Sequence, residues 1–208
     1  MFMLTKTRPQ TEKTLDLITA TAARSAKAVQ AYCKKAQNPD IIYRGGKGFK
    51  LQPVEPERLE DTVKMEQEAT NEEIEQIIAD YANAEKEFQT LRGSDLTDDT
   101  KLLDGSFAFD PQALKDLATK YVNNYSMHMA IVNYGKEKGI TIYPLQSAQS
   151  RADIVRGFFD MVYPRYLECT TVPYTASGGV EEVRMTGTVE DLVTACGHYK
   201  ARALKHVY

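Results

Sequence analysis

The stretch from Thr70 to Leu91 reads TNEEIEQIIADYANAEKEFQTL and has the clearest hydrophobic periodicity in the 208-residue chain. Its apolar residues recur at alternating steps of three and four, which predicts an amphipathic helix with one buried stripe. Thr70 and Glu73 have the spacing of a capping box, so a helix is expected to begin or tighten there and to end at Gly93. The predicted stripe consists of Ile74, Ile77, Tyr81, Ala84, Phe88 and Leu91. It covers fewer than three heptads, and therefore favours packing in a helical bundle over a coiled coil.

A second long helix is predicted on the N-terminal side, from Thr11 to Gln37, where the pair Asn38-Pro39 ends it. Its buried stripe consists mostly of small residues, which allow another helix to approach closely. The members are Leu15, Ile18, Ala22, Ala26, Val29, Cys33 and Ala36. Residues 57–69 have a weaker stripe and are also predicted to be helical.

Three more helices are predicted in the C-terminal half. Asp110 before Pro111 combines an N-cap residue with proline at the first helical position. A capping-box spacing from Ser150 to Asp153 opens a strongly apolar helix, which should end before Pro164 because the residue before a proline avoids helical dihedrals. The expected ranges are 111–135, 150–163 and 188–207, the last capped by Thr188 with Asp191.

Glycine pairs predict β-hairpins at two places, from Ile41 to Leu51 and from Thr170 to Gly187. Ile140–Tyr143 is predicted to be an additional short strand. We therefore expect a mainly α (α+β) fold: a helical bundle-like domain of five or six helices with two small β-hairpins. Residues 1–208 are expected to form a single domain. Any subdivision would separate residues 1–93, with the basic hairpin, from residues 111–208, with an acidic loop at 94–110 between them.

Charge is strongly segregated along the chain, although the formal net charge is only −3. Residues 1–50 contain ten basic and three acidic side chains, a net charge of +7. Residues 51–88 contain three basic and twelve acidic side chains, a net charge of −9. A chain with this pattern is suited to binding a polyanion at its basic end, or to docking on copies of itself through complementary potentials.

The first predicted hairpin is the candidate nucleic-acid-binding site. Its Gly-Gly turn places Arg44 opposite Lys47, and like charges that face each other across a hairpin are destabilising. A bound phosphate would relieve this repulsion. The predicted nucleic-acid-binding residues are Arg44, Lys47, Lys50, Phe49 and Tyr43, in which the two aromatic rings are available to stack on bases. The alternative is a basic turn that simply extends into water.

Residues that commonly perform catalysis or bind metals are few. The chain has three cysteines and three histidines, and no two of them have a spacing that would place metal ligands on one helix face. Cys196 and His198 are two residues apart, so on a helix they point in different directions. The glycines near Arg44 form neither a Walker loop nor a dinucleotide fingerprint. We therefore expect no catalytic residues, no cofactor and no metal, and keep an enzyme without a recognisable motif as an alternative.

These features favour a non-catalytic, self-assembling structural subunit that forms a homo-oligomer or larger assembly and binds RNA or DNA, such as a viral or phage coat or nucleoprotein. A small nucleic-acid-binding accessory or regulatory protein is the other alternative. No stretch has the roughly 18 to 20 apolar residues of a membrane span, so no membrane partner is expected. The apolar start Met1–Leu4 is too short for a signal peptide, which predicts a cytoplasmic protein or one within a virion or capsid.

Overall fold

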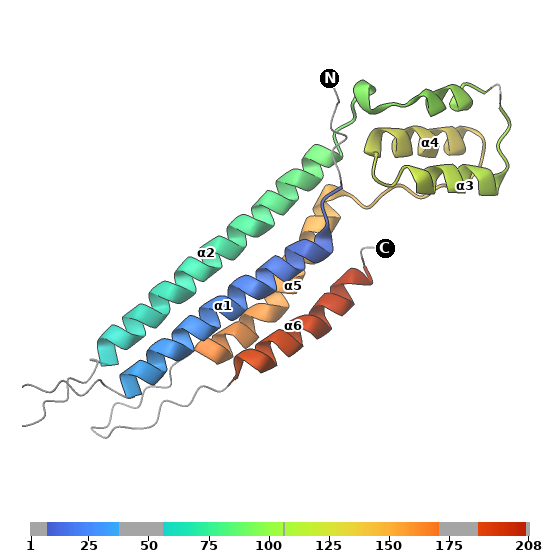
Figure 1. Ribbon diagram of the computed structural model, residues 1–208. Coiled ribbons are helices and arrows are strands. Elements are labelled where there is room, and N and C mark those ends of the chain that lie inside the picture. Colours follow the sequence, from blue (N-terminus) through green and yellow to red (C-terminus); the bar gives the residue numbers. More distant parts are fainter. Residues whose placement is uncertain (1–7, 38–55, 106, 171–186, 207–208) are drawn as a thin grey trace, which may run out of the picture. The chain divides into compact units, whose positions relative to one another are not determined.

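The computed structural model describes residues 8–37, 56–105, 107–170 and 187–206. These residues form six α-helices and two short 3-10 helices, and none of them is in a β-strand. The 3-10 helices are η1 (Gly93–Asp95) and η2 (Asp98–Leu103). The α-helices are α1 (Thr11–Gln37), α2 (Pro56–Phe88), α3 (Pro111–Lys120), α4 (Tyr125–Glu137), α5 (Ala148–Thr170) and α6 (Val189–Leu204), as labelled in Figure 1.

The predicted α+β class is wrong, because the described part of the chain is all-α. Ile140–Tyr143, expected to be a strand, is irregular and has no β partner among the described residues. It completes the end of α4 instead, where the amide of Ile140 donates to the carbonyl of Gly135 at 2.8 Å across Gly139, which has a φ of 72°. The expected hairpins at 41–51 and 170–187 lie outside the described residues except for Thr170 and Gly187.

The described residues divide into two compact units. The α3–α4 unit contains residues 8–11 and 79–153, without residue 106. The bundle unit contains residues 12–37, 56–78, 154–170 and 187–206. Since the boundaries fall inside α1, α2 and α5, each of these helices contributes residues to both units, α1 only its first residue, Thr11.

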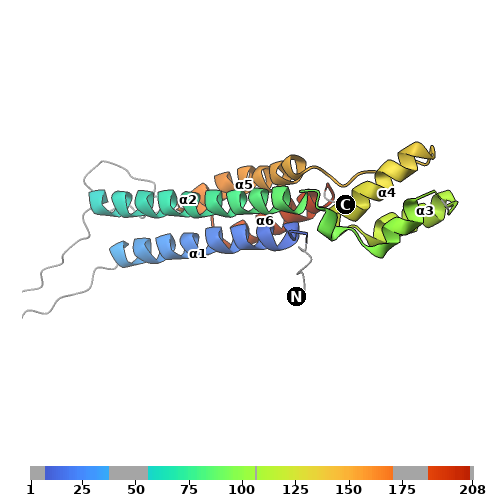
Figure 2. The same ribbon diagram turned by 90° about the horizontal axis from the view of Figure 1, so that it is seen from above.

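In the bundle unit, α1, α2, α5 and α6 lie alongside one another (Figures 1 and 2). Hydrogen bonds near the start of one helix repeatedly reach residues near the end of its neighbour. They join Asp16 to Lys200 and Gln30 to Gly187 between α1 and the α6 segment, and Gln67 to Thr170 and Glu75 to Arg156 between α2 and α5. Between α1 and α2, Thr21 bonds to Glu73, whereas Val29 and Cys33 cluster with Leu59 and Val63. The four helices therefore alternate in direction, up-down-up-down.

The buried stripe predicted for α1 is confirmed as far as its side chains are described. Leu15, Ile18, Ala22, Ala26, Val29 and Cys33 are all at most 4% exposed. Thr21 and Ser25 are also buried, and the Ser25 hydroxyl lies 2.9 Å from the Tyr166 hydroxyl of α5. The Tyr166 side chain of α5 thus reaches the buried, small-residue side of α1.

Helix α2 is continuous, which corrects the predicted restart at Thr70. The Thr70 hydroxyl donates to the carbonyl of Glu66 at 2.7 Å within the helix, instead of capping a new one. Most residues in the segment 57–69 have a high helix propensity, so the backbone hydrogen bonds of α2 continue through it to Thr70.

The buried stripe of α2 differs from the predicted one in its second half. Ile74, Tyr81 and Phe88 are buried as expected, but Leu91 is 65% exposed and lies beyond the helix. Ile77 is only partly buried and Ala84 is exposed. Their places are taken by Ile78 and by a charged residue, Glu85.

Two other helix boundaries differ from the prediction. The helix expected at 111–135 is divided into α3 and α4, because the side chain of Asn124 accepts from the amide of Met127 and starts a new helix. Helix α5 continues through Pro164 to Thr170. Proline removes one backbone hydrogen bond there, but Tyr166 and Cys169 beyond it are at most 2% exposed, and their burial stabilises the last turns. The predicted caps at Asp110 and Thr188 are confirmed.

The α3–α4 unit has a small apolar cluster and a buried polar network. Leu114 and Ala118 of α3 pack against Ile131 and Tyr134 of α4. Elsewhere in the unit, Arg151 forms an ion pair with Glu85, and both side chains are at most 3% exposed. The hydroxyls that complete this network are Thr11 and Tyr81, which lie 2.7 Å apart.

Candidate functional site

The nucleic-acid-binding residues predicted from the sequence, Arg44, Lys47, Lys50, Phe49 and Tyr43, all lie outside the described residues. The segment that contains them follows α1, whose own surface carries much of the N-terminal positive charge. The exposed basic residues of α1 are therefore the described candidates for an interaction site.

One side of α1 is exposed along its length. Apart from Arg24, which lies on this side and binds Glu73 of α2, the exposed residues on it are Lys13, Leu17, Ala20, Lys27, Ala31 and Lys34, spaced by three, four or seven positions. We call these six residues the basic α1 face. Leu17 is 51% exposed, on the side of α1 opposite its apolar stripe. The face combines positive charge with an uncovered apolar side chain.

The outer side of α2 in the bundle unit has the opposite charge. Asp61, Met65, Glu68 and Glu72 are all exposed and follow the same helical spacing. We call these four residues the acidic α2 face. Met65 is 69% exposed. Lys64 lies 4.0 Å from Glu68 and offsets one of the three carboxylates, so the face keeps a net negative charge.

Part of the segregated charge is neutralised inside the bundle unit. Arg24 of α1 donates to Glu73 of α2 at 2.5 Å, and this hydrogen bond raises the pKa of the Arg24 guanidinium. Glu75 of α2 accepts two hydrogen bonds from Arg156 of α5, which lower the pKa of the Glu75 carboxyl. These pairs therefore stabilise the bundle itself, whereas the two faces remain exposed.

Lys200 of α6 forms ion pairs with two acidic residues of α1. The Lys200 ammonium lies 2.6 Å from Asp16 and 3.0 Å from Glu12, and the hydrogen bond to Asp16 is the main cause of its raised pKa. Both acidic side chains are more than half exposed. The acidic residues near the start of α1, Glu12 and Asp16, are thus paired with Lys200 of α6.

The cysteines are unsuited to nucleophilic chemistry. All three are buried, and burial raises the pKa of the Cys33, Cys196 and Cys169 thiols, in the last case to about 11. The Cys169 thiol donates to the carbonyl of Thr188 at 3.1 Å. Protonated thiols are weak nucleophiles. As predicted, Cys196 and His198 point apart, since Cys196 is 1% exposed and His198 is exposed.

His128 is buried between two backbone carbonyls. Its Nδ1 lies 3.1 Å from the oxygen of Ala118 and its Nε2 lies 3.1 Å from the oxygen of Tyr143. Both ring nitrogens are therefore occupied by the backbone, and the side chain joins α4 to the end of α3 and to the irregular segment before α5. This contact makes His128 a structural residue of the α3–α4 unit.

A groove of about 420 Å³ lies between the second half of α5 and α6 in the bundle unit. In this groove Arg165 donates to Glu168 at 2.8 Å. This hydrogen bond is the main cause of the raised pKa of Arg165, and a hydrogen bond with Tyr199 is the second. Gly187 lies at the edge of the groove, where a β-carbon would come within 3.0 Å of the Cys169 sulfur, so a larger residue would require a small shift of that side chain. Cys169 and His198 both line the groove, but the Cys169 thiol donates its proton to the carbonyl of Thr188.

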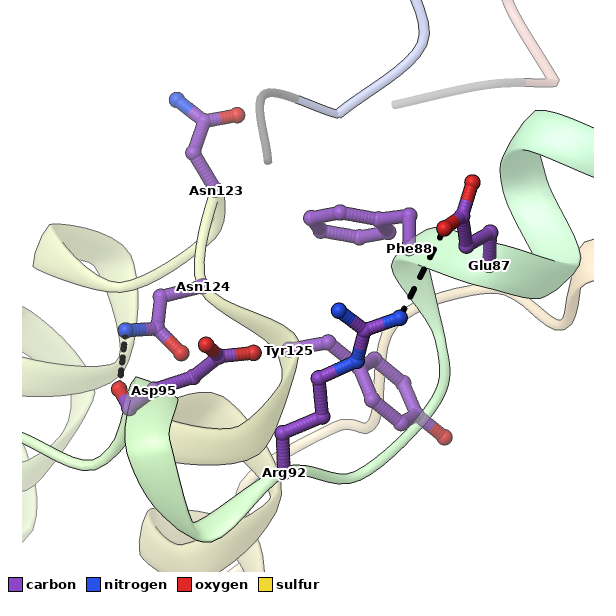
Figure 3. A pocket seen from close by; sticks show the side chains of 7 residues that line it. All are labelled: Glu87, Phe88, Arg92, Asp95, Asn123, Asn124 and Tyr125. Atoms are coloured by element: carbon purple, nitrogen blue, oxygen red, sulfur yellow. Dashed lines mark hydrogen bonds and ion pairs between the residues drawn. The ribbon is translucent and has the colours of Figure 1, made fainter. Parts of the chain in front are cut away.

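A smaller pocket in the α3–α4 unit has room for little more than one water molecule. Figure 3 shows Arg92 beside Glu87, with a nitrogen-to-oxygen distance of 3.6 Å, and Asn124 donating to the carbonyl of Asp95 at 2.6 Å. The Phe88 and Tyr125 rings meet edge to face, with centroids 6.1 Å apart. These contacts hold the start of α4 against the end of α2, both within this unit, and give the pocket a structural role.

Among the described residues, no group of three or more histidine, cysteine, aspartate or glutamate side chains is arranged to hold a metal ion. None of the described helices is long and apolar enough to cross a membrane. No protein-family model, curated protein or solved structure matches the chain.

Sequence reasoning found the segregation of charge but not these faces. It treated residues 1–50 and 51–88 as two charged blocks, and so did not separate Glu73, which binds Arg24, from Glu72, which is exposed. The available signal was the helical spacing of Lys13, Lys27 and Lys34, which places the three lysines on one side of α1.

Proposed function

We propose that the protein is a non-catalytic structural subunit that associates with copies of itself, of the kind found in viral or phage coats and nucleoproteins. The observation that carries the proposal is the presence of two exposed helix faces of opposite charge in one bundle, after Arg24, Glu73, Glu75 and Arg156 have paired internally. Complementary surface potentials steer protein association and fix its register.

The contacts of the cysteines and of His128 also support a non-catalytic role. The three cysteines are buried with raised pKa values, and the ring nitrogens of His128 contact backbone carbonyls. These side chains stabilise the fold and do not meet in a cavity. The groove beside α6 contains His198 and Cys169, but the thiol of Cys169 donates to a backbone carbonyl.

The self-association proposal is tested by sedimentation velocity on the full chain at low salt over a hundredfold range of protein concentration. We expect the weight-average sedimentation coefficient to rise with concentration, as mass action requires. A single species with the mass of one 23.4 kDa chain at every concentration would contradict the proposal.

Binding of RNA or DNA by residues 43–50 is the second part of the proposal, and it is supported by the sequence pattern of Arg44, Lys47, Lys50 and the neighbouring aromatic rings. Each phosphate contact contributes about 0.7 to 0.9 to the log–log salt dependence of affinity. Replacing Arg44 and Lys47 by Gln should therefore flatten the slope by roughly 1.5, measured by filter binding across salt concentrations.

A stacking residue should behave differently in the same assay. Phe49→Ala is expected to lose about 1 to 3 kcal/mol of single-strand affinity with little change in slope. The matched control for the replacement of Arg44 and Lys47 changes two exposed lysines of the α3–α4 unit, Lys115 and Lys136, to Gln and should leave the salt dependence unchanged. Wild-type protein that retained no RNA or DNA at low salt would overturn nucleic-acid binding while leaving self-association to its own test.

A further inference from the structure

We infer that copies of the protein dock through the basic α1 face of one copy and the acidic α2 face of another. This inference rests on the proposed self-association and specifies the surfaces that perform it. The occupant of each face is the opposite face of a second copy, because the two carry opposite charge and each also exposes a large apolar side chain, Leu17 or Met65.

The spacing of the charges on the two helices is compatible with such contacts. Lys27 and Lys34 are seven residues apart on α1, and Asp61 and Glu68 are seven residues apart on α2. Seven residues span two helical turns, or about 10.5 Å, so two cations on one helix can face two carboxylates on another at the same time. The match holds for either relative direction of the helices.

The apolar residues explain why these faces are suited to a protein partner. An exposed Leu or Met is buried when another helix covers it, and each Å² of apolar surface removed from water contributes about 25 cal/mol. Charges alone would suit a polyanion on α1 but would leave Met65 on α2 unexplained. A second copy accounts for both faces, since each copy carries the complement of the other.

The internal ion pairs define which charges are available. Arg24 and Glu73 bind each other within the bundle unit, so reversing either of them would disturb the fold as well as any docking. Lys27, Lys34, Glu68 and Glu72 are exposed, and within the described part of the chain Glu68 is the one of these four with an ion-pair partner, Lys64, at 4.0 Å. These four positions can therefore be reversed with little effect on the bundle.

The test uses two full-length variants, K27E/K34E and E68K/E72K. Each alone places like charges on both faces, and we expect at least a roughly tenfold rise in the apparent dissociation constant for self-association, measured by sedimentation velocity at low salt. The two variants mixed in equal amounts should associate again, because one supplies two acidic faces and the other two basic faces. The matched control, K115E/K136E, changes the net charge as much as K27E/K34E does and should associate like the wild type.

The outcomes separate this inference from the proposal beneath it. If the wild type self-associates and the reversed variants do so equally well, or if their mixture does not recover, the assignment of the two faces is wrong and self-association stands. If the wild type does not self-associate, the proposed function itself fails. Loss of association in K115E/K136E as well would show that net charge, and not these faces, controls assembly, which also overturns the inference. Circular dichroism of each variant at high salt verifies that the helices are intact.

Discussion

In the bundle unit the charged side chains of α1 and α2 lie at the surface around an apolar core, whereas the α3–α4 unit buries Glu85 and Arg151 together with the hydroxyls of Thr11 and Tyr81. The exposed charges of the bundle unit can contact a partner, whereas the buried charges of the α3–α4 unit contribute to the fold. Replacing a charged side chain should therefore change association in the bundle unit and stability in the α3–α4 unit.

The buried network illustrates the second case in detail. Arg151 donates to Glu85 and, at 2.8 and 3.1 Å, to Thr11 and to the carbonyl of Pro9. The Tyr81 hydroxyl donates to the same Glu85 oxygen at 3.0 Å, and burial raises the pKa of Tyr81 to about 12. The other oxygen of Glu85 has no hydrogen-bond partner among the described residues. A change of one member leaves the others buried and unsatisfied.

The largest effect on stability is expected for Glu85→Leu. Removing the carboxylate leaves the Arg151 guanidinium buried without a counter-charge, which should cost about 3 to 5 kcal/mol of unfolding free energy. The measurement is urea denaturation followed by circular dichroism. Glu72→Leu, on the acidic α2 face, is the control and should change the unfolding free energy by no more than about 0.5 kcal/mol.

A double variant sharpens this prediction. Glu85→Leu combined with Arg151→Met removes both charges and should recover most of the loss, because an apolar pair of similar volume can replace a buried ion pair at little cost. Equal stability losses for Glu85→Leu and Glu72→Leu would show that the two units do not differ in their use of charge.

The next largest effect is expected for His128→Phe in the α3–α4 unit. The carbonyl of Tyr143 loses its contact with the imidazole, whereas the carbonyl of Ala118 still accepts from the Tyr121 amide. We expect a loss of about 1 to 3 kcal/mol in urea denaturation, the cost of one lost hydrogen bond at a partly buried site. His198→Phe, at an exposed position of α6, should be nearly neutral. Similar losses for both would mean that the two carbonyl contacts of His128 contribute little.

An intermediate effect is expected for Ala22→Leu in the bundle unit. Ala22 is fully buried in the small-residue stripe of α1, and added methylenes in a packed core cost about 1 to 3 kcal/mol. Ala20→Leu, two residues earlier on the exposed side, is the matched control and should leave the unfolding free energy almost unchanged. If the larger side chain were tolerated equally at both positions, close packing against α1 would be disproved.

The smallest effect concerns the exposed pair of Glu75 and Arg156. Because Arg156 lowers the pKa of Glu75 in the folded state, the stabilisation is present above the ordinary pKa of 4.5 and is lost as the pH falls through the lowered value. Both side chains are about two-fifths exposed, so the pair should contribute only about 0.2 to 1 kcal/mol. Arg156→Gln should therefore lose this amount in urea denaturation at pH 7 and match the wild type in acid. A difference that grew in acid would reverse the sign of the argument.

The helices of the bundle were largely predictable from the sequence, because apolar residues at helical spacing mark the core side of α1 directly. The error in α2 has a specific cause. Ile74, Ile78, Tyr81, residue 85 and Phe88 follow the core spacing without interruption, but residue 85 is a glutamate, and a charged residue does not mark a core position in a hydrophobic pattern. Its partner, Arg151, is 66 positions away, and no local pattern links the two.

The boundaries show a similar limit. Pro164 and Thr70 are strong local signals for a helix end and a helix start, yet burial of Tyr166 and Cys169 carries α5 past the proline, and the Thr70 hydroxyl bonds within α2. Tertiary packing decided the first position, and a hydrogen bond within the helix decided the second. The charged faces could be predicted only in part, since the sequence gives the spacing of lysines and glutamates but not which of them are paired inside the bundle.

Charge-driven association is tested most directly by a variant that removes the charge pattern without altering the net charge. Lys27, Lys34, Glu68 and Glu72 all replaced by Gln leave the formal net charge at −3. We predict that the wild type sediments as larger species at low salt and dissociates as salt screens exposed charges over about 8 Å near 0.15 M, while the variant sediments as a monomer at both salt concentrations. Sedimentation profiles that are the same for the two proteins at low salt would contradict an assembly held by the opposite charges of α1 and α2.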